Sequence, residues 1–266
     1  MSAAATVIAI VAMTVALPLL WLRADVVDPR RFSATAAELG ATDTVRTFVA
    51  TMITEQIAKA AGTLTGSLAK PLAQRYTRSP AFIGDFVDLV DQQHAWLFDP
   101  PAPDVDPTVM RLDLTRMVRR VARQVAPMLG DQIGGPIRLP VTQRSAALRA
   151  GRYQRAAAVV SRWGIVALGI AVVAAVAALA SSASRGTTLV WLGLGMVLAS
   201  GVAWSLGAAL VSRIRRSTAG IDAGAREVVD STVGALAVQL NRWSRAVAGL
   251  GAAVVVLGVV ARLLWG

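Results

Sequence analysis

The sequence predicts a mainly α protein, with four transmembrane helices plus a mostly helical soluble domain that contains a small strand–helix–strand element. Four apolar runs are long enough to cross a bilayer, whose hydrocarbon core of about 30 Å needs about 20 helical residues. In the long polar segment between the first two runs, apolar residues recur at helical spacing. Two short stretches of that segment have the composition of strands instead.

The four apolar runs divide the chain into five parts. They cover residues 4–22, 163–180, 187–211 and 246–265, contain no acidic residue, and include one basic residue, Arg262. Because no water in the bilayer core satisfies backbone groups, an isolated run must be helical there. We expect a transmembrane anchor over 1–22, a soluble domain over 23–156, a transmembrane hairpin over 157–212, an amphipathic helical connector over 213–245, and a last transmembrane helix over 246–266.

The first run resembles a signal peptide in position but not in detail. No basic residue precedes it, and Leu22-Arg23-Ala24 at its end is not a small-x-small cleavage site. The run is also longer than a typical signal-peptide core. We therefore expect an anchor that is not cleaved.

Helix signals follow in the polar segment. Ser33 and Gly40 have the positions of an N-cap and a C-terminal glycine, and Asp43 that of a second N-cap. Ser79 followed by Pro80 predicts a third helix start. The second and third helices carry apolar stripes: Val45, Phe48, Val49, Met52, Ile53 and Ile57, then Phe82, Ile83, Phe86, Leu89, Val90 and Leu97. Prolines at 100, 101, 103 and 107 end the third helix.

Beyond these prolines the pattern changes. Residues 109–115 and 136–141 are predicted strands, and between them lies a predicted helix with Val118, Val121, Val125 and Leu129 on one side. A strand–helix–strand unit of this length predicts parallel pairing with a right-handed crossover. Pro140 restricts the second strand to a sheet edge, because proline has no N–H to donate.

Several short motifs together resemble a family. Trp21 is followed by V-V-D-P-R-R-F-S-A-T at 26–35, and V-x-x-L-D-L-T at 109–115 and I-x-L-P at 137–140 come later. This order is similar to that in uncharacterised actinobacterial multi-pass membrane proteins with a helical domain between the first and second transmembrane helices. The resemblance implies a cytoplasmic N-terminus and an extracytoplasmic domain, and it implies no catalytic residue. Members of the group usually have basic residues before the first span, whereas this sequence starts with Met-Ser-Ala-Ala-Ala.

Composition narrows the functional classes. The chain has no Cys, one His and a net charge of +11. Disulfides, thiolate nucleophiles and Cys-based metal sites are thereby excluded. Most arginines flank the apolar runs, which favours anionic lipid headgroups as partners. No aromatic-rich basic strand or nucleic-acid motif accompanies the charge, so we expect no nucleic acid.

Two arguments about membrane orientation conflict. Fourteen arginines lie in the two polar segments near the spans, whereas only Arg185 and Arg262 lie on the opposite side of the membrane. The positive-inside rule then places both polar segments in the cytoplasm. The resemblance implies the opposite, and we favour the extracytoplasmic side of the cell membrane for the soluble domain.

Small residues repeat every four positions in the third run. Gly195, Ala199, Ala203 and Gly207 form a stripe that allows another helix to approach closely. We favour packing within the chain; the alternative is a homodimer or a protein partner that docks on this helix. Matching faces are expected at Ala167, Ala171 and Ala175 in the second run and at Gly249 and Ala253 in the fourth. No charged residue lies deep in a run, which argues against proton-coupled transport.

The polar segments contain few chemical motifs. S-x-x-K at 67–70 lacks the companion motifs of serine acylases, and Pro71 predicts a helix boundary there. Asp85, Asp88 and Asp91 lie near His94, where they could contact a divalent cation or, alternatively, pair with arginines. Those arginines are Arg116, Arg119, Arg120 and Arg123. We assign no catalytic, cofactor-binding or metal-binding residue and expect no cofactor.

The polar segment between the third and fourth apolar runs has an apolar face. Apolar positions between residues 221 and 243 predict an amphipathic helix, which lies in the membrane interface or, as we favour, packs on the soluble domain. We expect a non-enzymatic envelope scaffold or accessory subunit that binds a protein partner. The alternative is a carrier or binder of an apolar ligand or lipid.

Overall fold

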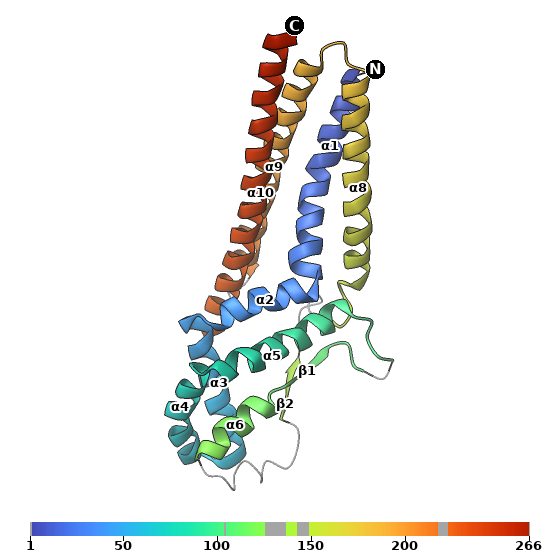
Figure 1. The fold of residues 1–266 in the computed structure, drawn as a ribbon. Coiled ribbons are helices and arrows are strands. Elements are labelled where there is room, and N and C mark those ends of the chain that lie inside the picture. Colours follow the sequence, from blue (N-terminus) through green and yellow to red (C-terminus); the bar gives the residue numbers. More distant parts are fainter. Residues whose placement is uncertain (1, 104, 126–136, 143–148, 218–222, 266) are drawn as a thin grey trace. The chain divides into compact units, whose positions relative to one another are not determined.

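The computed structural model describes residues 2–103, 105–125, 137–142, 149–217 and 223–265 (Figure 1). The chain forms two compact units. The transmembrane unit comprises Met1–Asp28, Ala157–Ala219 and Val233–Gly266, and the helical domain comprises Pro29–Ala156 and Gly220–Thr232. Helices make up most of the described residues, and four are long and apolar enough to cross a membrane. The predicted mainly α fold class is confirmed.

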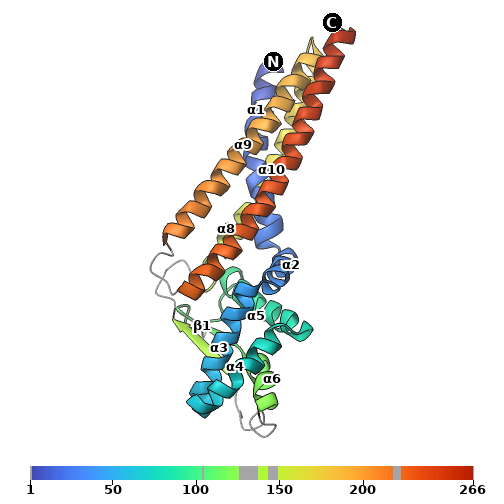
Figure 2. The same cartoon turned by 90° about the vertical axis from the view of Figure 1, so that its left-hand side faces the viewer.

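Long helices build the transmembrane unit: α1 (Ser2–Trp21), α8 (Gln154–Ala180), α9 (Arg185–Ser217) and α10 (Ala223–Trp265). The first residues of α8 and α10 belong to the helical domain. At 1.5 Å per residue, the 33 residues of α9 extend about 50 Å. This exceeds a hydrocarbon core of about 30 Å, so α9 is long enough to continue past the bilayer. Both views show α9 and α10 side by side (Figures 1 and 2).

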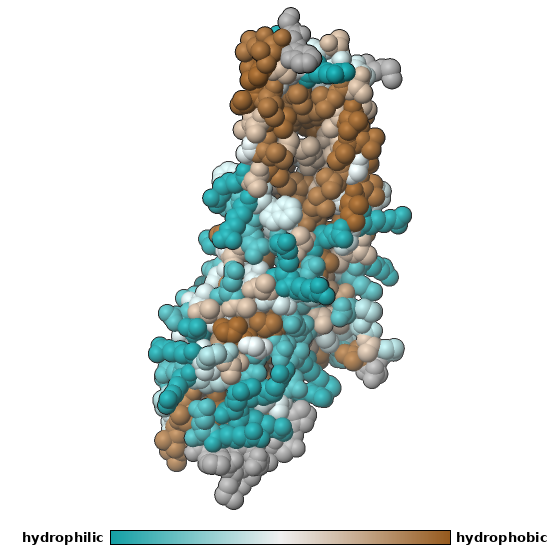
Figure 3. Space-filling model, in the orientation of Figure 1, coloured by the Kyte–Doolittle hydropathy of each residue, from teal (hydrophilic) through white to brown (hydrophobic). Residues whose placement is uncertain are grey.

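The outer surface of the transmembrane unit is apolar. Large side chains such as Val173, Leu198 and Leu257 are more than 60% exposed. Hydrophobic residues cover much of the visible face of these helices (Figure 3). Exposed apolar surface on this scale is unfavourable in water and suits contact with lipid.

The first helical segment extends beyond the predicted anchor. A π-helical turn, η1 (Leu22–Val27), follows α1 and carries Asp25, which is 1% exposed. The predicted anchor ends at Leu22, where the apolar run ends. The helical backbone continues nevertheless, and Asp25 is buried. Single π-helical turns occur frequently at functional sites.

The described part of the helical domain contains α2 (Pro29–Gly40), α3 (Asp43–Ala61), α4 (Thr63–Thr77), α5 (Pro80–Phe98) and α6 (Thr115–Val125). Leu129, predicted on the apolar side of the helix after residue 115, lies outside the described residues. The apolar faces of these helices enclose one core, in which Ile53, Phe82 and Val118 are 0% exposed. The predicted stripes of α3 and α5 supply much of this core. Burial of the apolar faces is therefore what orders these helices against one another.

The helix boundaries differ from the predictions at three points. Pro29 begins α2, so Ser33 lies inside the helix with its Oγ 2.6 Å from the Pro29 carbonyl oxygen and does not cap the helix. The N-cap of α3 is Thr42, whose Oγ1 accepts a hydrogen bond from the Val45 N–H at 3.5 Å, and not Asp43. Pro71 lies within α4 and does not end it.

The two strands pair differently from the prediction. β1 (Val109–Asp113) and β2 (Arg138–Thr142) are antiparallel, with Val109 opposite Thr142 and Asp113 opposite Arg138. The predicted parallel pairing is wrong because α6 packs against α3 and α4 instead of crossing the sheet. Without that crossover, the chain re-enters beside the end of β1, where the Leu114 N–H donates to the Ile137 carbonyl.

One continuous helix replaces the predicted connector and last span. Residues 213–217 end α9, and α10 runs from Ala223 to Trp265 without a break at 245. Val228, on the predicted apolar face, packs against the core of the helical domain. Leu236, Leu240 and Trp243 belong to a cluster in the transmembrane unit with Leu17, Trp21 and Ala203.

Candidate functional site

The predicted small-residue stripe of α9 faces helices of the same chain. A Cβ on Gly195 would lie 2.4 Å from Ile10 Cγ1 of α1, and Ala199 and Ala203 are 0% exposed. A Cβ on Gly207 would lie 2.4 Å from Leu240 Cδ2 of α10. Contacts within the chain therefore cover most of this stripe, and a partner that approaches α9 would meet its other faces.

The close contact between α9 and α10 is made at glycines that were not predicted as packing positions. A Cβ on Gly193 would lie 2.6 Å from the Gly251 carbonyl oxygen. A Cβ on Gly186 would lie 2.8 Å from the Gly258 carbonyl oxygen. Gly186 and Gly193 lie seven positions apart in α9, and Gly251 and Gly258 lie seven positions apart in α10. This heptad spacing is the sequence signal that could have identified the contact.

The matching faces predicted in the other spans are correct in part. In α8, Ala167 and Ala171 are buried, and Ala175 is half-buried. In α10, Gly249 and Ala253 are exposed, and a Cβ on Gly249 would have no neighbour within 4 Å. The prediction for α10 is therefore wrong, because that face of the helix points away from α9.

A polar network crosses the core of the helical domain. The hydroxyl of Tyr76 donates to Asp85 Oδ2 at 2.7 Å, and Arg120 Nε lies 3.0 Å from the same oxygen. A guanidinium nitrogen of Arg116 lies 4.0 Å from Asp85 Oδ1, and the Arg116 side chain also pairs with Asp88. Asp85 is buried, whereas both arginines are half-exposed or more. The network links α4, α5 and α6 through one carboxylate.

The acidic residues around His94 take separate partners. Asp85 and Asp88 pair with arginines of α6, as one of the two predictions stated, and Asp91 accepts from Ser33 at 2.5 Å. The His94 ring stacks on Phe98 with centroids 4.5 Å apart. Among the described residues, no group of three or more carboxylate and histidine side chains is arranged to hold a metal ion.

Burial alters the ionisation of Tyr76. Desolvation of the phenolate raises the pKa of Tyr76 well above its ordinary range, and the hydrogen bond to Asp85 raises it further. The phenol therefore remains a hydrogen-bond donor to Asp85 throughout the neutral range.

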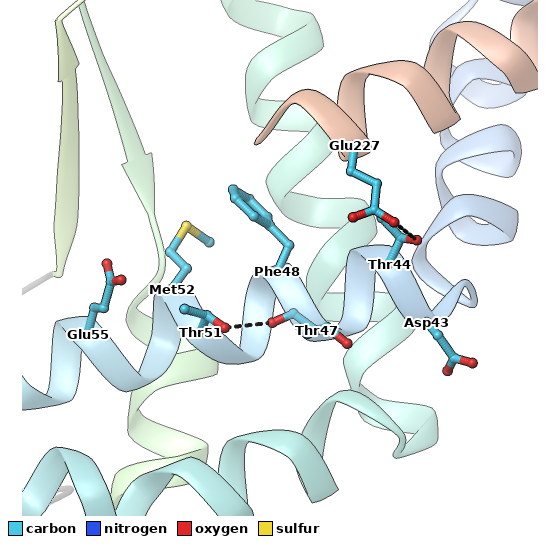
Figure 4. Close-up of a pocket in the computed structure, with 8 residues that line it drawn as sticks. All are labelled: Asp43, Thr44, Thr47, Phe48, Thr51, Met52, Glu55 and Glu227. Atoms are coloured by element: carbon cyan, nitrogen blue, oxygen red, sulfur yellow. Dashed lines mark hydrogen bonds between the residues drawn. The ribbon is translucent and has the colours of Figure 1, made fainter. Parts of the chain in front are cut away.

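An acidic groove lies along α3 in the helical domain and has a volume of about 630 Å³ (Figure 4). Its lining residues are Asp43, Thr44, Thr47, Phe48, Thr51, Met52, Glu55 and Glu227. Glu227, from the first turns of α10, accepts a hydrogen bond from Thr44 Oγ1 at 3.1 Å. We call this hollow the α3 groove.

The chemistry of the α3 groove is acidic at its edges and apolar between them. Asp43, Glu55 and Glu227 carry the charge, and none has a basic partner within 4 Å among the described residues. Phe48 and Met52 extend from α3 on the side that faces Glu227 (Figure 4). This combination can hold a cationic group together with an apolar one.

The α3 groove is not among the sites predicted from the sequence. Asp43, Thr47, Thr51 and Glu55 recur every four residues and so share one face of α3, which is a readable signal. Glu227 lies 183 positions from Thr44, and no local pattern connects them.

Comparisons with protein-family models, curated proteins and solved structures gave no match for this chain. The class of protein is therefore defined by the fold alone: a multi-pass α-helical membrane protein with a helical domain.

Proposed function

We propose that this chain is a non-enzymatic scaffold or accessory subunit of the cell envelope, whose helical domain binds a basic, partly apolar segment of a partner protein. The observation that carries the proposal is the α3 groove. Three carboxylates surround a hollow whose wall includes Phe48 and Met52. A segment with Lys or Arg beside a large apolar side chain would pair its charge with the carboxylates and bury its apolar part.

The charge of the α3 groove contrasts with that of the chain. The whole sequence carries +11, yet no Lys or Arg is among the residues that line this groove. Complementarity of this kind contributes selectivity and a faster encounter more than raw affinity. A basic partner would be repelled by much of the chain and attracted here.

Peptide binding tests the proposal with defined probes. The full chain in detergent is titrated with an amphipathic Lys/Leu peptide and with its Glu/Leu counterpart, followed by fluorescence anisotropy. We expect the Lys/Leu peptide alone to bind. Neutralising the groove with Asp43→Asn, Glu55→Gln and Glu227→Gln should weaken binding by about tenfold, since each exposed pair contributes up to about 1 kcal/mol.

The matched control removes three exposed acidic charges elsewhere in the helical domain, with Glu38→Gln, Asp99→Asn and Asp106→Asn. Affinity for the Lys/Leu peptide should then remain within about twofold, because none of these three side chains lines the α3 groove. Equal losses in the two triple variants, or equal binding of both peptides, would show that the groove is not the site.

We also propose that the helical domain lies on the extracytoplasmic side, which the resemblance supports and the arginine count opposes. The chain has no Cys, so a single cysteine can report exposure. Lys70→Cys places it at an exposed position of α4. A membrane-impermeant maleimide should label this variant in intact cells, with a cysteine at exposed Ser184, in the loop between α8 and α9, as the opposite-side control. Labelling of Ser184→Cys alone would place the domain in the cytoplasm.

A further inference from the structure

A second hollow lies between α9 and α10 in the transmembrane unit. Its volume is about 360 Å³, within the range of about 300–1,000 Å³ that is typical of ligand sites. Trp204, Ala208 and Val211 of α9 and Leu240 of α10 form its apolar part. Figure 2 shows the two helices separating toward the C-terminal end of α9. We call this hollow the α9–α10 cleft.

The length of α9 between two of its contacts with α10 can be compared with the thickness of a bilayer. Near one end of the pair, Gly186 approaches Gly258 and Arg262, and at the cleft Gly207 approaches Leu240. The 21 positions between Gly186 and Gly207 correspond to about 31 Å of helix. That length matches the hydrocarbon thickness of about 30 Å, so a bilayer whose core begins at Gly186 ends near the cleft. Trp204, which is 57% exposed, has the amphipathic ring that favours this level.

One arginine lines the polar end of the cleft, and two more are hydrogen-bonded to the backbone of residues that line it. Arg215 lines the cleft together with Ser212 and Asn241. Arg216 Nε donates to the Ser212 carbonyl at 3.1 Å, and Arg245 Nε donates to the Asn241 carbonyl at 3.3 Å. These two bonds hold both guanidinium groups beside residues that line the cleft. No acidic residue is among the described lining residues.

We propose that the α9–α10 cleft binds one anionic phospholipid. The arginines face the headgroup phosphate, for which the planar guanidinium supplies paired donors. The apolar part of the cleft accommodates the beginning of an acyl chain, and the remainder of the chain lies among the surrounding lipids. The positive charge of the cleft and its level near the membrane interface both match an anionic phospholipid.

Native mass spectrometry of the full chain in detergent tests this site. The protein is mixed with phosphatidylglycerol or phosphatidylcholine vesicle lipid, and we expect one retained phosphatidylglycerol. Arg215→Gln should reduce its occupancy about fivefold, because a direct ion pair at a half-open site contributes up to about 1 kcal/mol. Arg213→Gln removes the same charge from an exposed residue of the same helix outside the cleft and should leave occupancy unchanged.

Filling the cleft with a bulky side chain provides a second, independent test of lipid binding. Ala208→Trp fills the cleft without changing its charge, and Ala209→Trp adds the same ring at an exposed position outside the cleft. Only the first should displace the lipid. Equal retention of the two lipids, equal effects of Arg215→Gln and Arg213→Gln, or displacement by inorganic phosphate at concentrations that match the lipid would overturn the proposal. If Ala208→Trp fails to fold, the comparison of Arg215→Gln with Arg213→Gln still tests whether the cleft binds the lipid.

Discussion

Replacing Gly251 with leucine is expected to separate α9 from α10 and to destabilise the transmembrane unit by about 3 kcal/mol, the upper end of the usual cost of overpacking. A Cβ at this position would lie 2.8 Å from the Gly193 carbonyl oxygen and 2.8 Å from Met196 Cβ. The carbonyl belongs to the backbone of α9, so it cannot rotate away as a flexible side chain would. The helices must move apart instead, and they lose the dispersion contacts that hold them together in lipid.

The control for this prediction lies two residues away. Gly249→Leu introduces the same side chain into the same helix, but a Cβ there meets nothing within 4 Å. Thermal unfolding of the two variants in detergent, followed by loss of the monodisperse peak in size-exclusion chromatography, makes the comparison. The midpoint should fall for Gly251→Leu and stay at the wild-type value for Gly249→Leu. A similar fall in both would mean that close approach of α9 and α10 does not limit stability.

These two glycines also show what the sequence can and cannot predict. Apolar length alone identified all four spans, because lipid imposes the same requirement on any helix. The stripe from Gly195 to Gly207 was readable because it lies within one helix. The choice between Gly249 and Gly251 depends on how α10 is rotated against α9, and this is set by the partner helix. A helix carries its own period in its sequence, but the neighbour determines which face is used.

The same distinction applies to the helical domain. The stripe of α5 predicted that Phe82, Phe86 and Leu89 are buried, and they are. The direction of β2 was wrong because it depends on where α6 packs, which involves α3 and α4. The α3 groove needs Glu227 beside Thr44, a contact made by distant parts of the chain. Local burial is therefore predictable here, whereas pairing between elements is not.

Replacing Asp85 with alanine is expected to destabilise the helical domain by about 3 kcal/mol. The loss leaves the Tyr76 hydroxyl, on a residue 3% exposed, without its acceptor, and such a buried donor costs about 1–3 kcal/mol. The ion pair with Arg120 adds up to about 1 kcal/mol, since that side chain is 50% exposed and water screens it. Hydrogen–deuterium exchange of α4, α5 and α6 in the full-length protein measures the effect.

Asp88→Ala provides the matched control. Asp88 lies on the same helix and pairs with the same Arg116, but its side chain is 42% exposed. Its removal should cost less than about 1 kcal/mol, as for surface ion pairs in general. Equal costs for the two alanine variants would show that burial of the Asp85 carboxylate is not what makes the network stabilising.

Tyr76→Phe separates the hydrogen bond from the charge. Alone it should cost about 1 kcal/mol, and combined with Asp85→Ala it should cost less than the sum, because no buried hydroxyl is then left without an acceptor. Since the folded-state pKa of Tyr76 is raised, its contribution is constant below the unfolded value of about 10 and declines as pH increases beyond it. Protection of α4 and α5 should therefore decrease above about pH 10 in the wild type more than in Tyr76→Phe. Strict additivity of the two substitutions would contradict a direct Tyr76–Asp85 interaction, whereas a coupling of about 1 kcal/mol would identify this pair as the polar contact that joins α4 to α5.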